Sequence, residues 1–396
     1  MENFEFYNPV RVVFGKGSHK EVGQKLAGHA KHVLLLNTGS SYLTTSGLLP
    51  DIKQSLTAQG IAFTELTGIV ANPHFDKVEE GINLVKQNHI DFLLAVGGGS
   101  VIDTAKGIAG GANYTGDVWQ DLYEGNVEIT SALPLAVVLT IPASGSEVSN
   151  PSVITNTEID HKRTFVSPLM YPQFSIIDPE IFYTLPKKQI AYGIADTTTH
   201  IFERYFTQTK HTELIDGLCE SAMRTIMQIA PKVLADPTDY DAWSQIGLSA
   251  TMAHNDVLGM GRQQNWDSHE IEHEVSGLYN IPHGAGMSVI MPAWMTYVYK
   301  ANPDMFVQFA VNVMGVSLNA RDENAVALEG ITRLKKFYTN VLGIPTNLRG
   351  LGVPDQSQFE KMAKGAVRYQ DGQDNTLGQF KPEHWQDVVN IYKLAF

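Results

Sequence analysis

Apolar residues in the first half of the chain recur in two alternating patterns. Short continuous apolar runs predict buried strands, and stretches with apolar positions three or four residues apart predict helices between them. The predicted strands lie at 32–37, 61–66, 92–96, 134–140, 152–155 and 174–178. The predicted helices lie at 46–58, at 75–88 and from Ser100 onward. This alternation predicts an α/β fold, in which crossover helices join the strands of a parallel sheet.

The pattern changes after the pair Asp178-Pro179. From about Lys187 the apolar positions recur at helical spacing, and strand-like runs become rare. The segment T-L-P-K-K at 184–188 carries a proline where the first turn of a helix favours one. We therefore expect two domains, as the length of 396 residues also suggests: an α/β domain over 1–183 and an all-α domain over 184–396.

Charge and cysteine content narrow the class of protein. The formal net charge is −13 with the acids scattered along the chain, which argues against nucleic acid or an anionic membrane as a partner and favours a small molecule. Cys219 is the only cysteine, so an intrachain disulfide is impossible and a cysteine-built metal site does not fit. The N-terminus lacks a signal-peptide pattern, and the apolar stretch 91–111 contains Asp103 and Lys106, which a membrane span would not tolerate cheaply. We expect a cytoplasmic protein.

A glycine-rich turn joins a predicted strand to a predicted helix in the α/β domain. Its residues are Gly97, Gly98, Gly99 and Ser100. Because glycine has no Cβ, backbone N–H groups can approach a pyrophosphate here, and the helix N-terminus favours negative charge. The turn lacks the third glycine of G-x-G-x-x-G, where Ile102 stands, so a tight turn that simply needs glycine explains it about equally well.

A second loop of similar character, TIPASGSEVS at 140–149, also follows a strongly apolar strand. Taken alone, it is an ordinary serine-rich loop. Together with the glycine turn, it favours a nucleotide bound at the edge of the sheet, where the strands end.

Two segments of the all-α domain concentrate an acid and four histidines. Asp196 and His200 are four residues apart and therefore share one helix face, as do His269 and His273, and His283 follows after a short loop. Each histidine by itself is more often structural than a ligand. The cluster favours a metal site built from Asp196, His200, His269 and His283, whose oxygen and nitrogen atoms suit Fe²⁺ or Zn²⁺.

The same region contains the zinc-peptidase pattern H-E-x-x-H. In that reading His269 and His273 bind zinc and Glu270 is the general base. The longer form of the motif needs a glycine and a third histidine where this chain has Ser276 and Tyr279. A zinc hydrolase therefore stays an alternative, but it leaves the glycine turn, the second loop and the Asp196/His200 pair unexplained.

With the GGGS turn, the SGSE loop, D-x-x-x-H and H-x-x-x-H…PHG in this order, the chain resembles the iron-containing (group III) alcohol dehydrogenases along its whole length. It is most similar to the butanol dehydrogenase and broad aldehyde reductase branch. The resemblance implies a dehydroquinate-synthase-like fold, with an α/β dinucleotide-binding domain and an all-α metal-binding domain. It also implies a homodimer.

The implied activity is reversible hydride transfer between NAD(P)H and a short-chain aliphatic aldehyde of the butanal type. A glycerol or lactaldehyde dehydrogenase of the same family is the nearest alternative. A sugar-phosphate lyase would need basic residues beside 269–283, where Arg262 is the only nearby cation. A nucleotide-sensing metalloprotein without turnover is a further, non-enzymatic alternative.

The resemblance also implies roles for individual residues. Asp196, His200, His269 and His283 bind the metal, whereas His273 lies near the nicotinamide as a candidate proton relay. The implied cofactor contacts extend beyond the glycine turn and fall in both halves of the α/β domain. They are Asn72, Gly98, Gly99, Ser100, Asp103, Thr140, Ser144 and Lys162.

The loop N-T-G-S-S-Y at 37–42 bears on the choice of cofactor. NAD-preferring members of the family carry an aspartate here against the ribose hydroxyls. Gly39, Ser40 and Ser41 instead leave room and offer donors for a 2′-phosphate, which an acid would repel. We therefore favour NADP(H), and NAD(H) stays possible because the loop has no cation to pair with the phosphate.

Overall fold

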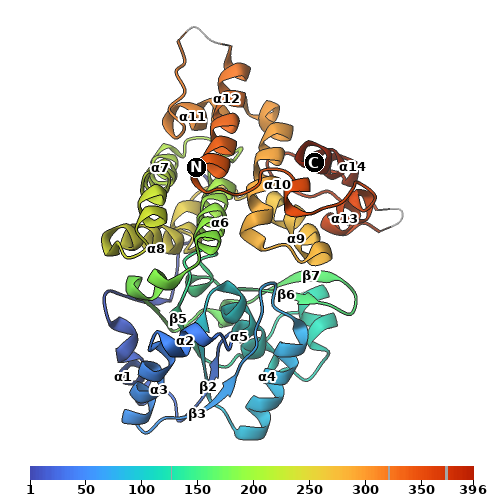
Figure 1. Cartoon of the computed structure of the whole chain (residues 1–396). Coiled ribbons are helices and arrows are strands. Elements are labelled where there is room, and N and C mark those ends of the chain that lie inside the picture. Colours follow the sequence, from blue (N-terminus) through green and yellow to red (C-terminus); the bar gives the residue numbers. More distant parts are fainter. Residues whose placement is uncertain (126, 320–321, 371–372) are drawn as a thin grey trace. The chain divides into compact units, whose positions relative to one another are not determined.

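The computed structural model describes residues 1–125, 127–319, 322–370 and 373–396 (Figure 1). The chain divides into two compact units, which we call the α/β unit and the helical unit. The α/β unit comprises Tyr7–Leu185 and Pro237–Gly247, and the helical unit comprises Met1–Phe6, Pro186–Asp236 and Leu248–Phe396. The predicted division at 183/184 instead places residues 1–6 in the α/β domain and residues 237–247 in the all-α domain.

Within the described residues, the α/β unit contains a six-stranded sheet in the order β1-β8-β5-β4-β2-β3. All its neighbouring strands are parallel, as predicted. The strands are β1 (Arg11–Phe14), β2 (His32–Leu36), β3 (Ala62–Leu66), β4 (Phe92–Gly97), β5 (Leu135–Leu139) and β8 (Phe174–Ile177). β4 and β5 are buried along their whole length, which accounts for their continuous apolar sequences.

The strand predicted at 152–155 does not join this sheet. It is β6 (Pro151–Asn156), which pairs antiparallel with β7 (His161–Val166) in a separate hairpin. Neither β7 nor β1 was predicted. β7 begins with three basic or titratable residues, H-K-R, and β1 is only four residues long and mostly exposed, so neither shows a buried apolar run.

Helices cover both faces of the six-stranded sheet. Val33 and Leu35 of β2 point toward a core that also contains residues of α1 and α3. Side chains at the alternate positions point to the opposite face of the sheet. On that face β4 and β5 pack against α5, which in turn packs against α4. The helices of this unit are α1 (Val22–Leu26), α2 (Ser41–Thr45), α3 (Leu48–Ala58), α4 (Phe75–Asn88) and α5 (Gly99–Gly111). The unit is therefore a doubly wound α/β fold.

The second half of the chain forms helices, as predicted. They are α6 (Lys187–Tyr205), α7 (Glu213–Ala235), α8 (Tyr240–His254), α9 (Asp267–Tyr279), α10 (His283–Val298), α11 (Pro303–Asn312), α12 (Glu323–Lys336), α13 (Phe359–Ala366) and α14 (Trp385–Ala395). α10 packs against α6, α9 and α14. It is apolar on nearly every side, because it is the helix that the others surround. No helix in the described part of the chain is both long and apolar enough to cross a membrane.

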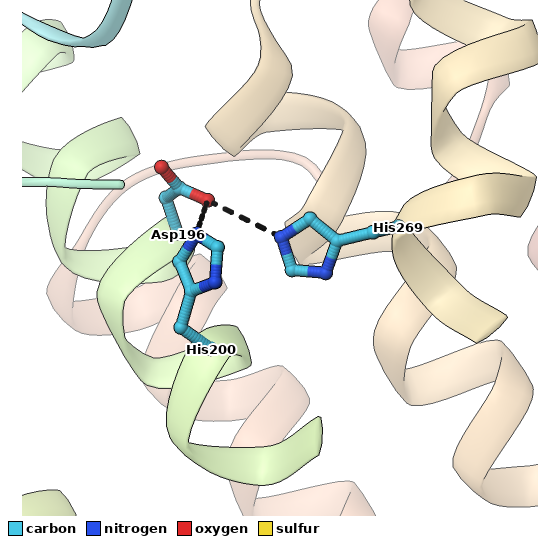
Figure 2. A group of neighbouring side chains, drawn as sticks. All are labelled: Asp196, His200 and His269. Carbon is cyan, nitrogen blue, oxygen red and sulfur yellow. Dashed lines mark ion pairs between the residues drawn. The ribbon is translucent and has the colours of Figure 1, made fainter. Parts of the chain in front are cut away.

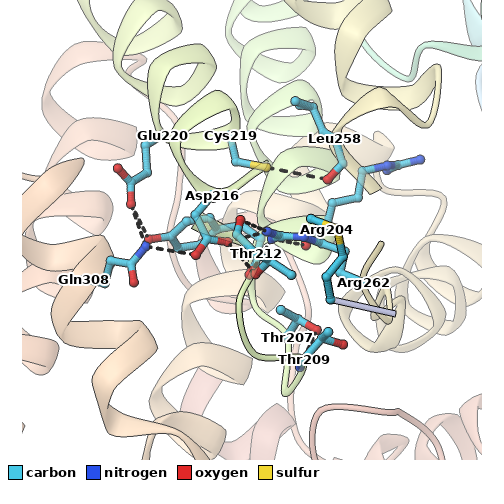
Figure 3. A network of polar contacts seen from close by, with 12 residues as sticks. Arg204, Thr207, Thr209, Thr212, Asp216, Cys219, Glu220, Leu258, Arg262 and Gln308 are labelled. Carbon is cyan, nitrogen blue, oxygen red and sulfur yellow. Dashed lines mark hydrogen bonds and ion pairs between the residues drawn. The ribbon is translucent and has the colours of Figure 1, made fainter. Parts of the chain in front are cut away.

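A buried polar network fixes the C-terminal end of α6 (Figure 3). Nη1 of Arg262 donates to the carbonyl oxygens of Arg204 and Tyr205, at 3.0 and 3.3 Å. Its Nη2 donates to the carbonyl oxygen of Thr212 at 3.2 Å and to the carboxylate of Asp216. These bonds satisfy carbonyl groups that a helix end leaves unpaired, and the guanidinium charge suits the negative end of the helix dipole. Arg262 thus has a structural role, which leaves the lyase alternative without its candidate cation.

Candidate metal centre and nucleotide-binding edge

Four side chains of the helical unit converge on one point. Asp196 and His200 lie one turn apart on α6, His269 lies in the first turn of α9, and His283 is the first residue of α10. Figure 2 shows Asp196, His200 and His269 directed toward one another. Oδ1 of Asp196 lies 3.4, 3.8 and 3.5 Å from the Nε2 atoms of His200, His269 and His283. The structure therefore brings together all four residues that the sequence selected.

Two glycines allow the helices to approach closely enough for this convergence. A Cβ atom on Gly284 would lie 2.1 Å from the carbonyl oxygen of Tyr192 on α6. A Cβ atom on Gly286 would lie 2.1 Å from Oε1 of Glu272 on α9. Because Gly284 follows His283 directly and Gly286 lies three residues after it in the first turn of α10, the glycines set the distance of His283 from α6 and α9.

The distances at this centre fit a bound cation better than hydrogen bonds. Oδ1 of Asp196 and the Nε2 atoms of His200 and His269 are buried, and none of the three has a hydrogen-bond partner among the described residues. Such atoms are costly unless something else satisfies them. Ligand atoms about 2.1 Å from a tetrahedral metal ion lie about 3.4 Å from one another, close to the separations observed. The centre can accommodate a divalent ion held by one carboxylate and three imidazoles.

The protonation states of His200 and Asp196 suit metal binding. Burial and the nearby His269 lower the pKa of His200 to about 4, so its imidazole is neutral near pH 7. Burial alone would raise the pKa of Asp196, but His200 and His283 hold it well below its usual value. A neutral imidazole and an ionised carboxylate are the forms that bind a metal.

Two buried glutamates, which the sequence analysis missed, support the imidazoles from behind. Oε2 of Glu203 accepts a hydrogen bond from Nδ1 of His269 at 2.5 Å, and the carboxylate of Glu272 accepts one from Nδ1 of His283. Each bond leaves Nε2 of its histidine directed to the centre. Burial alone would lower the pKa of His269, but Glu203 and Asp196 raise it to about 10. The spacing i, i+4, i+7 of Asp196, His200 and Glu203 on α6 was the signal that could have identified Glu203.

His273 lies beside the centre but does not converge on Oδ1 of Asp196. Its ring centroid is 5.6 Å from that of His283 and 6.3 Å from that of His269. With Glu272 and His283 it forms a separate group whose ligand atoms lie within 4.8 Å of one another. His273 therefore lies next to the ligand set.

An aromatic group lies against the same centre. His254 stacks on Trp266 with ring centroids 5.3 Å apart, and the ring of His254 lies 4.5 Å from that of His200. Trp266 in turn lies 5.5 Å from His269, and the guanidinium of Arg204 lies 4.7 Å from the indole ring. Nothing in the local sequence marks His254 as part of this group.

In the α/β unit, the predicted nucleotide contacts gather where neighbouring strands end. Gly39 follows β2, the glycine turn follows β4, and the second loop follows β5; these three strands are adjacent in the sheet. β2 and β4 are neighbours in the sheet. After β2 the chain continues to β3, on one side of this pair, and after β4 it continues to β5, on the other side. The loops after β2 and β4 therefore diverge, and such a point is where doubly wound sheets bind their ligands. Ser40 is the N-cap residue of α2 and Ser41 is its first residue, directly after Gly39.

The three glycines of the turn are required by the protein itself. A Cβ atom on Gly97 would lie 2.4 Å from the side chain of Val101. On Gly98 it would lie 2.1 Å from Cγ2 of Ile141, and on Gly99 it would lie 2.7 Å from Oγ of Ser144. Gly98, the N-cap residue of α5, offers no capping side chain, so the first N–H groups of the helix have no cap from that residue. The turn packs the two loops together and presents a helix N-terminus.

The remaining predicted contacts lie in two places. Nζ of Lys162 on β7 donates to Oδ1 of Asn72 at 3.2 Å, and the N–H of Thr155 donates to the carbonyl oxygen of Pro73 at 2.8 Å. Asn72 and Lys162 are therefore adjacent. The carboxylate of Asp103, whose pKa is raised by burial, accepts from Oγ of Ser146 at 2.6 Å, so it links α5 to the second loop. Thr140 follows β5 at the start of that loop.

Two family models match the chain. One, described as iron-containing alcohol dehydrogenase, matches residues 9–179, and the other, described as the C-terminal region of the Fe-containing alcohol dehydrogenase family, matches residues 190–396. The chain belongs to the iron-containing alcohol dehydrogenase family. The resemblance recognised in the sequence motifs is thereby confirmed, and so is the enzyme class: the chain is an oxidoreductase.

Relatives in this family align with the chain from end to end. A probable NADH-dependent butanol dehydrogenase of Bacillus subtilis is 39% identical over 395 residues, which is 100% of each chain. The NADPH-dependent aldehyde reductase YqhD of Escherichia coli is 32% identical over 90% of this chain and 91% of its own. The crystal structure of NADH-dependent butanol dehydrogenase A from Thermotoga maritima superposes with a TM-score of 0.94 at 36% identity, covering 100% of this chain and 99% of that chain. The predicted fold class is confirmed.

Family membership supports a nicotinamide cofactor and a metal for the two constellations of residues described above. The zinc-hydrolase reading of H-E-x-x-H gains no support from any of these relatives. In the structure, the carboxylates of Glu203 and Glu272 bind the Nδ1 atoms of His269 and His283, and neither residue belongs to the H-E-x-x-H signature positions.

Proposed function

We propose that this chain is a metal-dependent alcohol dehydrogenase and aldehyde reductase. It transfers hydride reversibly between a nicotinamide cofactor and a short-chain aliphatic aldehyde such as butanal. The convergence of three Nε2 atoms on Oδ1 of Asp196 carries the proposal, because that oxygen and the Nε2 atoms of His200 and His269 are buried and unsatisfied unless a cation binds them. The relatives named as butanol dehydrogenases support the substrate class.

The residues of the chain have distinct tasks in this reaction. When bound, a divalent cation supplies Lewis acidity at the carbonyl oxygen, and the nicotinamide supplies the hydride. Asp196, His200, His269 and His283 hold the cation. His273 passes a proton to the substrate oxygen, a task that suits an imidazole beside the ligand set.

We propose Fe²⁺ or Zn²⁺ as the metal. Both ions accept imidazole and carboxylate ligands, and the ligand set contains no thiolate. Availability in the cell, rather than affinity, then decides which ion occupies the centre.

We propose NADP(H) as the preferred cofactor, with NAD(H) possible. Gly39 has a φ of 72°, and the loop around it contains no acid to repel a 2′-phosphate. Lys77 lies next to Gly68, but its Nζ is already paired with Glu80 at 2.7 Å. A Cβ atom on Gly39 would lie 3.4 Å from the nitrogen of Gly68, and one on Gly68 would lie 3.7 Å from Nζ of Lys77. The relatives include both NADH- and NADPH-dependent enzymes, so the ratio has to be measured.

Apolar aldehydes suit the surroundings of the metal centre. The stacked rings of Trp266 and His254 lie against His200 and favour an aliphatic chain over a polyol. The second candidate is a diol or glycerol dehydrogenase, because 1,3-propanediol dehydrogenase of Klebsiella pneumoniae is 30% identical to the chain.

We further propose a cytoplasmic homodimer. Val12 and Phe14 lie on the edge strand β1, and both are well exposed, at 39% and 40%. An edge strand with apolar side chains is a natural site for pairing with a second copy. Cys219 is a free, buried thiol, as suits a reducing compartment. Light scattering on the protein and on Val12→Lys tests the dimer, which the lysine should weaken.

The substrate and cofactor proposals are tested together by the loss of NADPH or NADH absorbance. Butanal, 3-hydroxypropanal and lactaldehyde are each supplied to the metal-loaded enzyme. The proposal expects the highest kcat/KM with butanal, and a higher value with NADPH than with NADH. A preference for the hydroxylated aldehydes would instead favour the diol dehydrogenase.

A further inference from the structure

A lysine is completely buried on α5, the helix that begins at the glycine turn. Nζ of Lys106 donates to the carbonyl oxygen of Ser146 at 2.7 Å, to Oγ of Ser146 at 2.8 Å and to the carbonyl oxygen of Pro151 at 3.1 Å. An ammonium group has three donors, and all three are used. Lysine is rarely buried in this way unless its charge serves a purpose.

The acceptors of Lys106 belong to a polar group that includes Asp103. Oγ of Ser146 donates to Oδ1 of Asp103 at 2.6 Å, and Oδ2 of Asp103 accepts from the N–H of Val153 at 3.2 Å. Asp103 and Lys106 are three residues apart on α5 and so lie on one face of the helix. We call Asp103, Lys106 and Ser146 the α5 anchor.

The α5 anchor holds the second loop against the glycine turn. Ser146 begins the short helix η3 (Ser146–Val148), which follows directly on Ser144 and Gly145. At the glycine turn the two loops lie close together, since a Cβ atom on Gly99 would lie 2.7 Å from Oγ of Ser144. Asp103 and Lys106 both bond to Ser146, while the uncharged side chains of Ser175 and Asn8 bond to the carbonyl oxygens of Glu147 and Val148 on the same short helix. The ammonium group of Lys106 therefore contributes a charged contact to the position of the second loop.

We propose that Lys106 is a positioning residue for cofactor binding: through Ser146 it holds the second loop in the arrangement that the nicotinamide cofactor requires. Lys106 itself is too deeply buried to touch the cofactor. The inference rests on the proposed function, because it takes the two loops to be the cofactor-binding loops.

The charge of Lys106 makes this arrangement sensitive to pH. Burial lowers the pKa of Lys106 to about 8, although the carboxylates of Asp103 on α5 and Glu147 on η3 oppose the shift. The positive charge of Lys162, on β7, acts to lower the pKa of Asp103. A neutral amine has only two donors, so Lys106 loses one of its three bonds when it loses its proton, and two of those three bonds go to Ser146 in the second loop. Cofactor affinity should therefore fall as the pH rises through this range.

The test measures the Kd of NADPH and of NADH by cofactor fluorescence, together with bound metal and kcat. Lys106→Met keeps the length of the side chain and removes the charge, and Lys86→Met, on the exposed face of α4, is the matched control. We expect Lys106→Met to raise the Kd by about tenfold or more, as the loss of bonds from a charged donor implies. Metal content and kcat at saturating cofactor should stay within about twofold of the parent, because the lysine touches neither the metal nor the reacting atoms.

The pH profile separates this role from a merely structural one. In the unmodified enzyme the Kd should rise between about pH 7 and about pH 9, and the rise should be absent from Lys106→Met. If Lys106→Met does not fold, Ser146→Ala, which removes one acceptor and keeps both charges, should raise the Kd by a few-fold, about what one hydrogen bond is worth.

Three outcomes would contradict the inference: an unchanged Kd in folded Lys106→Met, the same pH profile in both proteins, or an unchanged Kd in Ser146→Ala. A parent enzyme that binds neither NADPH nor NADH would instead contradict the proposed function.

Discussion

Carboxylates that bind the far nitrogen of an imidazole decide which nitrogen faces a metal. Glu203 performs this task for His269, and Glu272 performs it for His283. His200 has no such partner among the described residues, since both of its nitrogens lack a hydrogen bond. The centre is thus supported unevenly, and we expect the two glutamates to matter for metal affinity although neither converges on the metal position.

Replacing Glu203 by Gln should weaken metal binding by about 10- to 100-fold, the usual effect of losing an outer carboxylate. Glutamine keeps the shape of the side chain but loses the charge that holds the Nδ1 proton of His269. Competition with a chelator of known affinity measures the effect. Glu270→Gln, on α9 beside His269, is the matched control and should bind metal normally. Equal affinities in Glu203→Gln and the parent would show that this carboxylate has no such role.

Spacing in the sequence was sufficient to identify the four residues that converge, because helix periodicity places Asp196 with His200. It could not identify His254, which comes close to the centre only through the packing of separate elements. Asp103 was assigned to the cofactor from the resemblance. The structure shows its carboxylate bonded to Ser146 and Val153, a detail that no local pattern reveals.

At the scale of elements, continuous apolar sequence predicted the central strands well. β4 and β5 are buried along their whole length, and β2 is buried from Val33 to Leu36, so these residues are all apolar. The same rule could not find β1 or β7, whose sequences are mixed. It also could not assign β6 to its sheet, since pairing depends on distant residues.

The junction of α6 with α10 is one element-scale contact with a clear test. A Cβ on Gly284 would lie 2.1 Å from the carbonyl oxygen of Tyr192, so Gly284→Ala should push α10 away from α6 and displace His283. We expect a loss of stability of about 1–3 kcal/mol and weaker metal binding, measured by denaturant unfolding and metal content. Gly217→Ala on α7, where an added Cβ meets nothing within 4 Å, should be neutral or slightly stabilising. Similar behaviour of the two variants would contradict the account.

A histidine ties the turn η1 (Ser18–Glu21) to the end of β8 and to α3. Nδ1 of His19 lies 2.7 Å from Oδ2 of Asp178, and its Nε2 lies 3.3 Å from Oδ2 of Asp51. Burial alone would lower the pKa of His19, but the two carboxylates raise it above its usual value. Protonated His19 therefore stabilises the fold at a pH below about 6.5, and this stabilisation is lost as the pH rises through the raised pKa.

His19→Gln should accordingly lose more stability at acidic than at alkaline pH. We expect a difference of about 1 kcal/mol in the free energy of unfolding between about pH 6 and about pH 9, as measured by denaturant titration. His29→Gln, at an exposed position near α1, should show no such difference. A destabilisation of His19→Gln that does not change with pH would mean that the charge on the ring contributes nothing.

At the scale of the whole molecule, two units each carry one part of the chemistry. The helical unit carries the four convergent ligands, and the α/β unit carries the strand ends with their two loops. Composition and periodicity predicted both architectures. They could not predict that 1–6 belongs to the helical unit, where the N–H of Glu2 donates to Gly261, or that 237–247 belongs to the α/β unit, where Trp243 packs on Phe182. These contacts join residues far apart in sequence.

The most direct test of the central claim is a titration of metal-stripped enzyme with Fe²⁺ under anaerobic conditions, repeated with Zn²⁺. Bound metal and the rate of NADPH oxidation by butanal are measured at each step. The account predicts that one ion binds per chain at the cluster of Asp196, His200, His269 and His283, and that the rate rises in proportion to occupancy until the centre is full. Full activity in the metal-stripped enzyme, or a metal that binds there without changing the rate, would contradict it.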